Sequence, residues 1–284
     1  MTRSWTIAFV AVYWAILAHT AVGDDISTQL RSAQEQLKLG QFKIAQDHVD
    51  AALKLDDKNA QIHFMQGEIF AAMRKHDPAI SAYEKAYQLD NKMIIAVDRR
   101  GGEQFKLGKV AESIVDFDRY LKVFPKQEAA HWRRGISYYY VKKFAEGARQ
   151  FDIGQEVFGA DVENAFWYWL CLCGKDGVQK ANSKILKLSA PDARIPMMDI
   201  YAMLQGKAKP EDVIVTATNA KLSADDKNEA MFYANLYVGL YYEGIGKPKE
   251  SLKHIETAVE KYVISHYMWD VAKVHHLLRT GKKD

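Results

Sequence analysis

A repeat of 34 residues is the sequence feature that most constrains the fold of this chain. Gly67, Gly101 and Gly135 are separated by 34 positions each. Seven residues further along, a second series has the same spacing: Gly40, Arg74, Gly108 and Lys142. A fixed period of this length indicates stacked helix-turn-helix units, each of which buries its apolar face against its neighbours. The sequence therefore predicts an all-α protein.

The period divides the chain into four consecutive repeats and one later repeat. They cover 26–59, 60–93, 94–127, 128–161 and, after an interruption, 232–265. The first helix of each carries a small residue at the same register: Ala33, Gly67, Gly101, Gly135 and Gly239. Because glycine inside a helix costs about 0.5–1 kcal/mol relative to alanine, its recurrence predicts close contact between two helices. Turns are expected near 39–41, 74–76, 107–109 and 141–143.

Between residues 162 and 227 the period is lost. Helices are expected at about 162–173, 176–188, 196–205 and 210–220, with Gly174 in an exposed turn. Residues 266–279 have helical periodicity, and a stack of repeats needs a terminal cap, so we expect a capping helix there. The predicted parts are a signal peptide at 1–23, four repeats at 24–161, a degenerate helical segment at 162–231, and the final repeat with its cap at 232–284.

The N-terminus has the pattern of a secretory signal peptide. Arg3 precedes an apolar stretch from Ser4 to Ala18, and Ala21 and Gly23 are the small residues that a signal peptidase reads. We expect cleavage after Gly23 and export to the periplasm or the medium. A retained membrane anchor is the alternative, but the stretch is shorter than the roughly 20 apolar residues that span a bilayer. No stable membrane span is expected after cleavage.

Composition and charge fit a folded protein rather than a nucleic-acid-binding one. Hydrophobic residues make up 48% and charged residues 26% of the chain, and the formal net charge is only +3. The two cysteines, Cys171 and Cys173, would point about 200° apart on a helix, so we do not expect them to form a disulfide with each other.

The repeat positions resemble the tetratricopeptide repeat family. The second repeat is the best match, through Gly67, Phe70, Ala79, Tyr83 and Ala86. The resemblance implies a right-handed superhelix whose concave groove binds a protein or peptide. The order of parts, together with the aromatic segments 166–169 and 237–242, is similar to NlpI-type periplasmic adaptors, which are envelope proteins that bind other proteins. The lipid-attachment cysteine of that group is absent, because Asp24 follows the predicted cleavage site.

No pattern of an enzyme is present in the sequence. Zinc-protease, serine-hydrolase and phosphate-loop motifs are missing. His275 and His276 are adjacent, and on a helix they would point about 100° apart, so we expect one buried and one exposed side chain rather than a metal site. We therefore expect no catalytic residue, cofactor or metal.

Six residues are predicted to line the concave groove. In tetratricopeptide repeats the first helix of each pair forms the inner surface, and aromatic residues mixed with arginine dominate protein recognition sites. The predicted binding residues are Phe64, Arg99, Phe105, Trp132, Arg133 and Tyr139. The alternatives are core packing for the aromatic rings and a solvated face for the arginines.

Two hypotheses for function follow. The first is an exported, non-enzymatic scaffold that binds a protein or peptide in its groove. The second is a structural protein that assembles into homo-oligomers through its aromatic surfaces.

Overall fold

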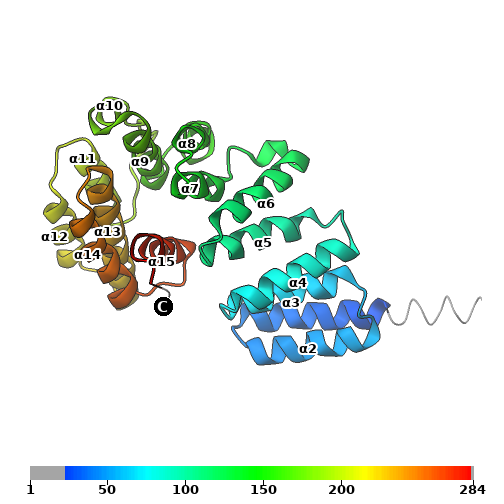
Figure 1. The fold of residues 1–284 in the computed structure, drawn as a ribbon. Coiled ribbons are helices and arrows are strands. Elements are labelled where there is room, and N and C mark those ends of the chain that lie inside the picture. The colour runs from blue at the N-terminus through cyan, green and yellow to red at the C-terminus, as the bar shows by residue number, and fades with distance from the viewer. Residues whose placement is uncertain (1–22, 283–284) are drawn as a thin grey trace, which may run out of the picture. The chain divides into compact units, whose positions relative to one another are not determined.

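The computed structural model describes residues 23–282, and every regular element in this range is a helix (Figure 1). The predicted all-α class is confirmed. The predicted signal peptide lies outside the described residues, apart from Gly23.

The chain forms two compact units that divide within α5, between Glu103 and Gln104. The first unit contains a helix at 23–38 and three further complete helices. These are α2 (Phe42–Leu55), α3 (Ala60–Ala72) and α4 (His76–Leu89), followed by most of α5 (Ile94–Lys106).

The second unit contains the end of α5 and all later helices. They are α6 (Val110–Val123), the 3₁₀ turn η1 (Pro125–Gln127), α7 (Trp132–Tyr140), α8 (Phe144–Phe158), α9 (Val162–Asp176), α10 (Val178–Asn182), α11 (Met197–Leu204), α12 (Pro210–Asn219), α13 (Ala224–Gly244), α14 (Pro248–Lys261) and α15 (Tyr267–Thr280). The predicted repeats correspond to helix pairs, although α7 begins only at Trp132 and α13 begins well before position 232.

The small residue of the first helix packs against the second helix of the same pair. A Cβ atom at Gly135 would lie 2.7 Å from the ring of Phe151, and one at Gly239 would lie 2.9 Å from Ile255. Real Cβ atoms are hardly ever this close to another atom. The glycine therefore lets the facing side chain pack directly against the helix backbone. The predicted helix-helix contact is confirmed at these two positions.

The turns within the helix pairs share one backbone conformation. Left-handed φ angles occur at Gly40 (70°), Arg74 (58°), Gly108 (74°), Lys142 (60°) and Gly246 (76°). This is the second 34-residue series of the sequence, continued into the last repeat. The predicted turn positions are confirmed, and the left-handed residue is what ends the first helix of each pair.

The predicted helix at 176–188 is wrong. The short helix α10 covers only Val178–Asn182, and no further helix begins before Met197. The Ser189 amide donates to the carbonyl of Gly159 (2.8 Å), and the Tyr201 hydroxyl donates to the carbonyl of Leu186 (3.0 Å). Hydrogen bonds to distant parts of the unit therefore replace the local helical ones.

The predicted exposed turn at Gly174 is also wrong. Helix α9 runs through this position, and a Cβ atom on Gly174 would lie 2.6 Å from the ring of Phe144. The helix ends instead at Gly177, whose φ of 86° suits glycine.

Helix α15 packs against α14, and two of its side chains also contact Phe105 and Tyr140 from earlier repeats. The ring of Tyr267 stacks on Phe105 with centroids 5.7 Å apart, and the hydroxyl of Tyr140 lies 3.2 Å from Nδ1 of His275. Through Tyr267, helix α15 therefore covers Phe105, which the sequence placed at the concave surface.

Among residues 23–282, no helix has both the length and the apolar character needed to cross a membrane.

Candidate functional site

The six predicted binding residues are divided between the two units. Phe64 and Arg99 belong to the first unit. The ring of Phe64 lies 5.7 Å from that of Tyr83, and the Arg99 Nε atom is 3.3 Å from Glu68 Oε1. The Tyr83 hydroxyl donates to the same carboxylate oxygen at 2.6 Å. Arg99 and Glu68 thus form one polar group next to an aromatic pair.

The other four predicted residues lie in the second unit, in different surroundings. Phe105 and Tyr139 are core residues with exposed fractions of 0% and 6%. Trp132 is half-buried and meets the ring of Tyr267 edge-on at 5.2 Å. The Arg133 guanidinium lies over the ring of Phe117 at 5.4 Å. The structure therefore brings Phe105 and Trp132 together around Tyr267, while Tyr139 packs inward.

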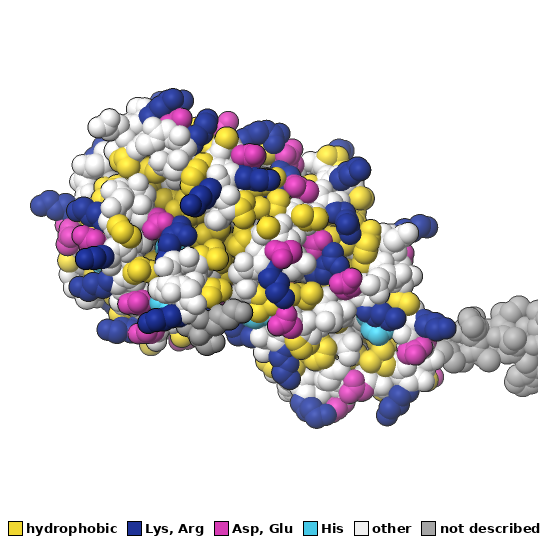
Figure 2. All heavy atoms as spheres, viewed as in Figure 1, with side chains coloured by type: hydrophobic (Ala, Val, Ile, Leu, Met, Phe, Trp, Pro, Cys, Tyr) yellow, Lys and Arg dark blue, Asp and Glu magenta, His cyan; other side chains and the backbone are white. Residues whose placement is uncertain are grey.

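Trp132 lines a cavity of about 180 Å³, which we call the Trp167 cavity. Its apolar wall consists of Trp132, Ile136, Phe151, Phe158, Trp167 and Met268, and its polar lining consists of Asp161, Glu163, Asn164, Arg194 and His266. Figure 2 shows hydrophobic side chains gathered over the middle of this unit, with charged side chains around them.

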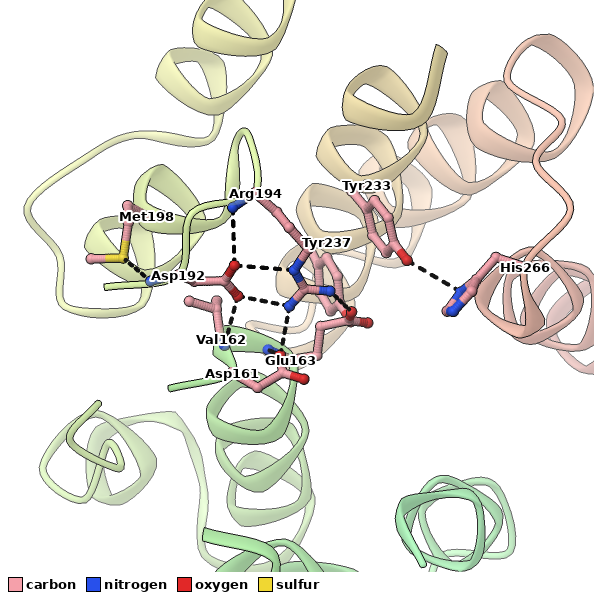
Figure 3. Close-up of polar contacts among 9 residues, drawn as sticks. All are labelled: Asp161, Val162, Glu163, Asp192, Arg194, Met198, Tyr233, Tyr237 and His266. Carbon is pink, nitrogen blue, oxygen red and sulfur yellow. Dashed lines mark hydrogen bonds and ion pairs between the residues drawn. The ribbon is translucent and has the colours of Figure 1, made fainter. Parts of the chain in front are cut away.

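The polar side of the cavity is organised by Arg194. Its guanidinium contacts Asp161 (2.8 Å), Glu163 (2.6 Å) and Asp192 (2.7 Å). We call these four residues the Arg194 cluster. Figure 3 shows Arg194 reaching from its loop to the first turn of α9, beside α13. The cluster thus joins two segments that are about 30 residues apart in the sequence.

The start of α9 places two of these carboxylates. Asp161 is the N-cap residue, and its side chain accepts a hydrogen bond from the Glu163 amide at 2.8 Å. Glu163 lies in the first turn, where the positive end of the helix dipole stabilises negative charge. The Val162 amide, in the same turn, donates to Asp192 at 3.2 Å.

The electrostatics of the cluster are dominated by carboxylates. With all three carboxylates ionised and the single guanidinium protonated, the cluster carries a net formal charge of −2. Burial, together with the nearby Asp161 carboxylate, raises the pKa of Glu163. Glu163 also accepts a hydrogen bond from the Tyr237 hydroxyl on α13. The site is therefore an acidic border on an apolar cavity.

Two residues of the cavity lining each carry a fully buried polar atom that has no hydrogen-bond partner. These atoms are the indole Nε1–H of Trp167, a side chain that is 1% exposed, and the side-chain oxygen Oδ1 of Asn164. Buried donors and acceptors are nearly always paired in folded proteins, so such a pair needs an explanation.

The Arg194 cluster was missed in the sequence because its members come from separate segments. The available signal was the segment from Pro191 to Pro196, where two prolines interrupt a helical pattern around Asp192 and Arg194. Prolines in such positions exclude a regular helix, but they do not show which residues a loop will contact.

The structure offers no metal-ligand cluster within residues 23–282. Both cysteines are free thiols; Cys171 is buried, and burial raises the pKa of Cys173 to about 12. His275 is fully buried and His276 is partly buried. The expectation of one buried and one exposed histidine is thus correct for His275 only.

The helix pairs of residues 23–282 define a helical repeat protein. Residues 30–94 match the sequence model of a tetratricopeptide repeat family. No curated protein sequence matches the chain.

Solved structures show the same fold. A tetratricopeptide repeat protein from Parabacteroides merdae is 14% identical, with a TM-score of 0.57, and the match covers 90% of this chain and 99% of that chain. PilF from Pseudomonas aeruginosa is 13% identical, with a TM-score of 0.50 and coverage of 83% and 92%. The MamA protein is 16% identical, with a TM-score of 0.52 and coverage of 57% and 88%. At these identities the similarity concerns the fold alone.

Proposed function

We propose that this chain is an exported, non-enzymatic scaffold that binds a protein or peptide partner. The tetratricopeptide repeat match and the fold support a protein-interaction role, because stacked repeats of this kind create extended binding surfaces. The observation that carries the proposal is Trp132, a half-buried tryptophan at the edge of an apolar cavity. Aromatic anchors beside such pockets supply much of the binding energy in protein complexes.

In the second unit, the proposed partner occupies the part of the surface that α15 leaves open. The ring of Tyr267 on α15 covers Phe105. Trp132 contacts Tyr267 and also lines the cavity. Phe64 and Arg99 stay predicted binding residues of the first unit.

A purified partner provides the direct test of this function. Mature chain immobilised on a resin would capture candidates from an envelope extract, and each purified candidate would then be titrated against wild type and Trp132→Ala. We expect the variant to lose about 2 kcal/mol or more of binding free energy while its circular dichroism spectrum stays unchanged. Phe124→Ala, which removes an exposed ring outside the cavity, is the matched control. Normal binding by folded Trp132→Ala would place the partner elsewhere.

The proposed export rests on the N-terminal pattern. Mature protein should begin at Asp24 and be found in the periplasm or the medium. N-terminal sequencing of the protein from its native cells tests this directly. Retention of Met1 in a membrane fraction would favour the anchor alternative.

Light scattering separates the scaffold from the self-assembling alternative. A scaffold should keep one mass over a wide concentration range and grow only when its partner is added. A mass that rises with concentration in the absence of any partner would favour homo-oligomers.

A further inference from the structure

We propose that the Trp167 cavity binds one large apolar side chain of a partner polypeptide, and that the residues flanking this side chain are Lys or Arg. The inference rests on the proposed function, because it names the chemistry of the segment that the scaffold recognises.

The size and lining of the cavity suit one aromatic or branched aliphatic side chain. Its volume is about 180 Å³. A cavity of roughly 150 Å³ lined by apolar groups accepts a benzene molecule, so a phenylalanine or leucine side chain fits here. Trp132 and Ile136 on α7, together with Trp167 on α9, provide three of its apolar walls.

The charges around the cavity favour flanking cations. The Arg194 cluster has three carboxylates and one guanidinium, and the Asp161 and Arg194 side chains are 35% and 41% exposed. Arg194 already contacts all three carboxylates, so it offers little to an anionic ligand. Burial lowers the pKa of His266, which therefore adds no positive charge at neutral pH.

The groups that face His266 strengthen the same preference. Glu229 and Asp270 act on it as nearby negative charges, while Arg194 is the nearby positive one. Lys106 lies 3.9 Å from Asp270 and partly compensates that carboxylate. Complementary charge of this kind selects between partners and speeds their association.

The test uses three capped tripeptides and the full mature chain. Acetyl-Lys-Phe-Lys-amide should bind, whereas Lys-Ala-Lys and Glu-Phe-Glu with the same caps should bind at least tenfold more weakly. Isothermal titration gives the affinities. Indole N–H signals in an NMR spectrum report the site, and Trp167→Phe identifies the Trp167 signal by removing it. Equal affinities for the three peptides, or no shift of that signal on binding, would overturn the proposal.

Two variants and one control locate the binding. Asp161→Asn keeps an N-cap side chain for α9 but removes a charge, so it should weaken Lys-Phe-Lys binding about threefold to tenfold. Ile136→Phe fills the cavity and should abolish binding. Glu260→Gln removes an exposed carboxylate on α14 outside the cavity and should leave the affinity unchanged. Circular dichroism spectra confirm that each variant is folded.

Failure here and failure of the proposed function give different results. If a purified partner binds the mature chain but Asp161→Asn and Ile136→Phe bind it like wild type, the scaffold function stands and the cavity proposal is overturned. If Ile136→Phe no longer binds the partner, and the wild-type chain prefers Lys-Phe-Lys among the three tripeptides, the scaffold function and the cavity proposal are both supported.

Discussion

Gly67 and Tyr83 are in such close contact that a Cβ atom on Gly67 would lie 2.6 Å from Cδ1 and Cε1 of the tyrosine ring. Tyr83 is 1% exposed, and its hydroxyl donates to Glu68, so the ring is held on both sides. The contact joins the two helices of the second repeat.

The first prediction concerns this contact. Gly67→Ala should destabilise the first unit by about 1–3 kcal/mol, the usual effect of overpacking a filled core. Tyr83→Leu should also destabilise it, but the double variant should be more stable than the sum of the single effects predicts, because a smaller side chain makes room for the methyl group. Thermal melts followed by circular dichroism measure all three. Additive effects would show that the two residues are not coupled.

The second prediction concerns the left-handed turn residues. Lys142 has a φ of 60°, a conformation that costs a non-glycine residue about 1–2 kcal/mol. Lys142→Gly should therefore stabilise the second unit by about 0.5–1 kcal/mol, after allowance for the more flexible unfolded chain. Tryptophan fluorescence during denaturation reports this unit, because all four tryptophans after Gly23 lie in it.

The reverse change provides the control for this prediction. Gly40 has a φ of 70° and open space around its Cα atom, so Gly40→Ala introduces backbone strain without a steric clash. It should destabilise the first unit by about 1 kcal/mol. An unchanged or higher stability would contradict the explanation.

The third prediction concerns pH and His275 on α15. Burial, with the nearby Arg279 charge, lowers the pKa of His275 to about 3. In the unfolded chain a histidine titrates near pH 6.5, so between pH 6.5 and 3 the unfolded state binds a proton that the folded state does not. Stability should therefore fall as the pH decreases through this range. Urea midpoints at pH 7 and 4.5 measure the loss.

Substitution isolates the contribution of this residue. His275→Gln keeps a polar group for the Tyr140 hydroxyl but cannot take up the proton. Between pH 7 and pH 4.5, the variant should lose about 2–3 kcal/mol less free energy of unfolding than wild type. His276→Gln, at the partly buried neighbouring position, should keep most of the pH dependence. Identical pH profiles for wild type and His275→Gln would contradict the assignment.

The fourth prediction concerns Arg194. Arg194→Ala leaves three carboxylates without their shared cation and should destabilise the second unit by about 1–3 kcal/mol, less than for a fully buried group because the side chain is 41% exposed. Arg194→Lys should recover only part of this loss, since Nε and both terminal nitrogens make separate contacts.

An exposed arginine gives the comparison. Arg149 pairs with Glu128 and lies exposed at the surface of α8, so Arg149→Ala should change stability by about 0.5 kcal/mol or less. Denaturation followed by tryptophan fluorescence covers both positions. Equal effects of Arg194→Ala and Arg149→Ala would show that the Arg194 cluster is not structurally important.

The amino-acid sequence by itself determined the helix pairs and their turns. Helical hydrogen bonds connect residues four apart, and the left-handed turns at Gly40, Gly108 and Lys142 depend on one residue each. The small residue of the first helix could be located for the same reason, because Gly67 and Tyr83 belong to one repeat. Such short-range features recur with the 34-residue period and can be identified from spacing alone.

Only the tertiary structure decided where α15 lies and how the Arg194 cluster forms. Tyr140 and His275 are 135 residues apart in the chain, and Glu163 and Tyr237 are 74 apart. Periodicity predicts which face of a helix is apolar, but it does not show which distant helix will cover that face. Tyr139 was therefore predicted as a groove residue although it packs into the core, and the acidic border of the Trp167 cavity emerged only when separate segments were brought together by folding.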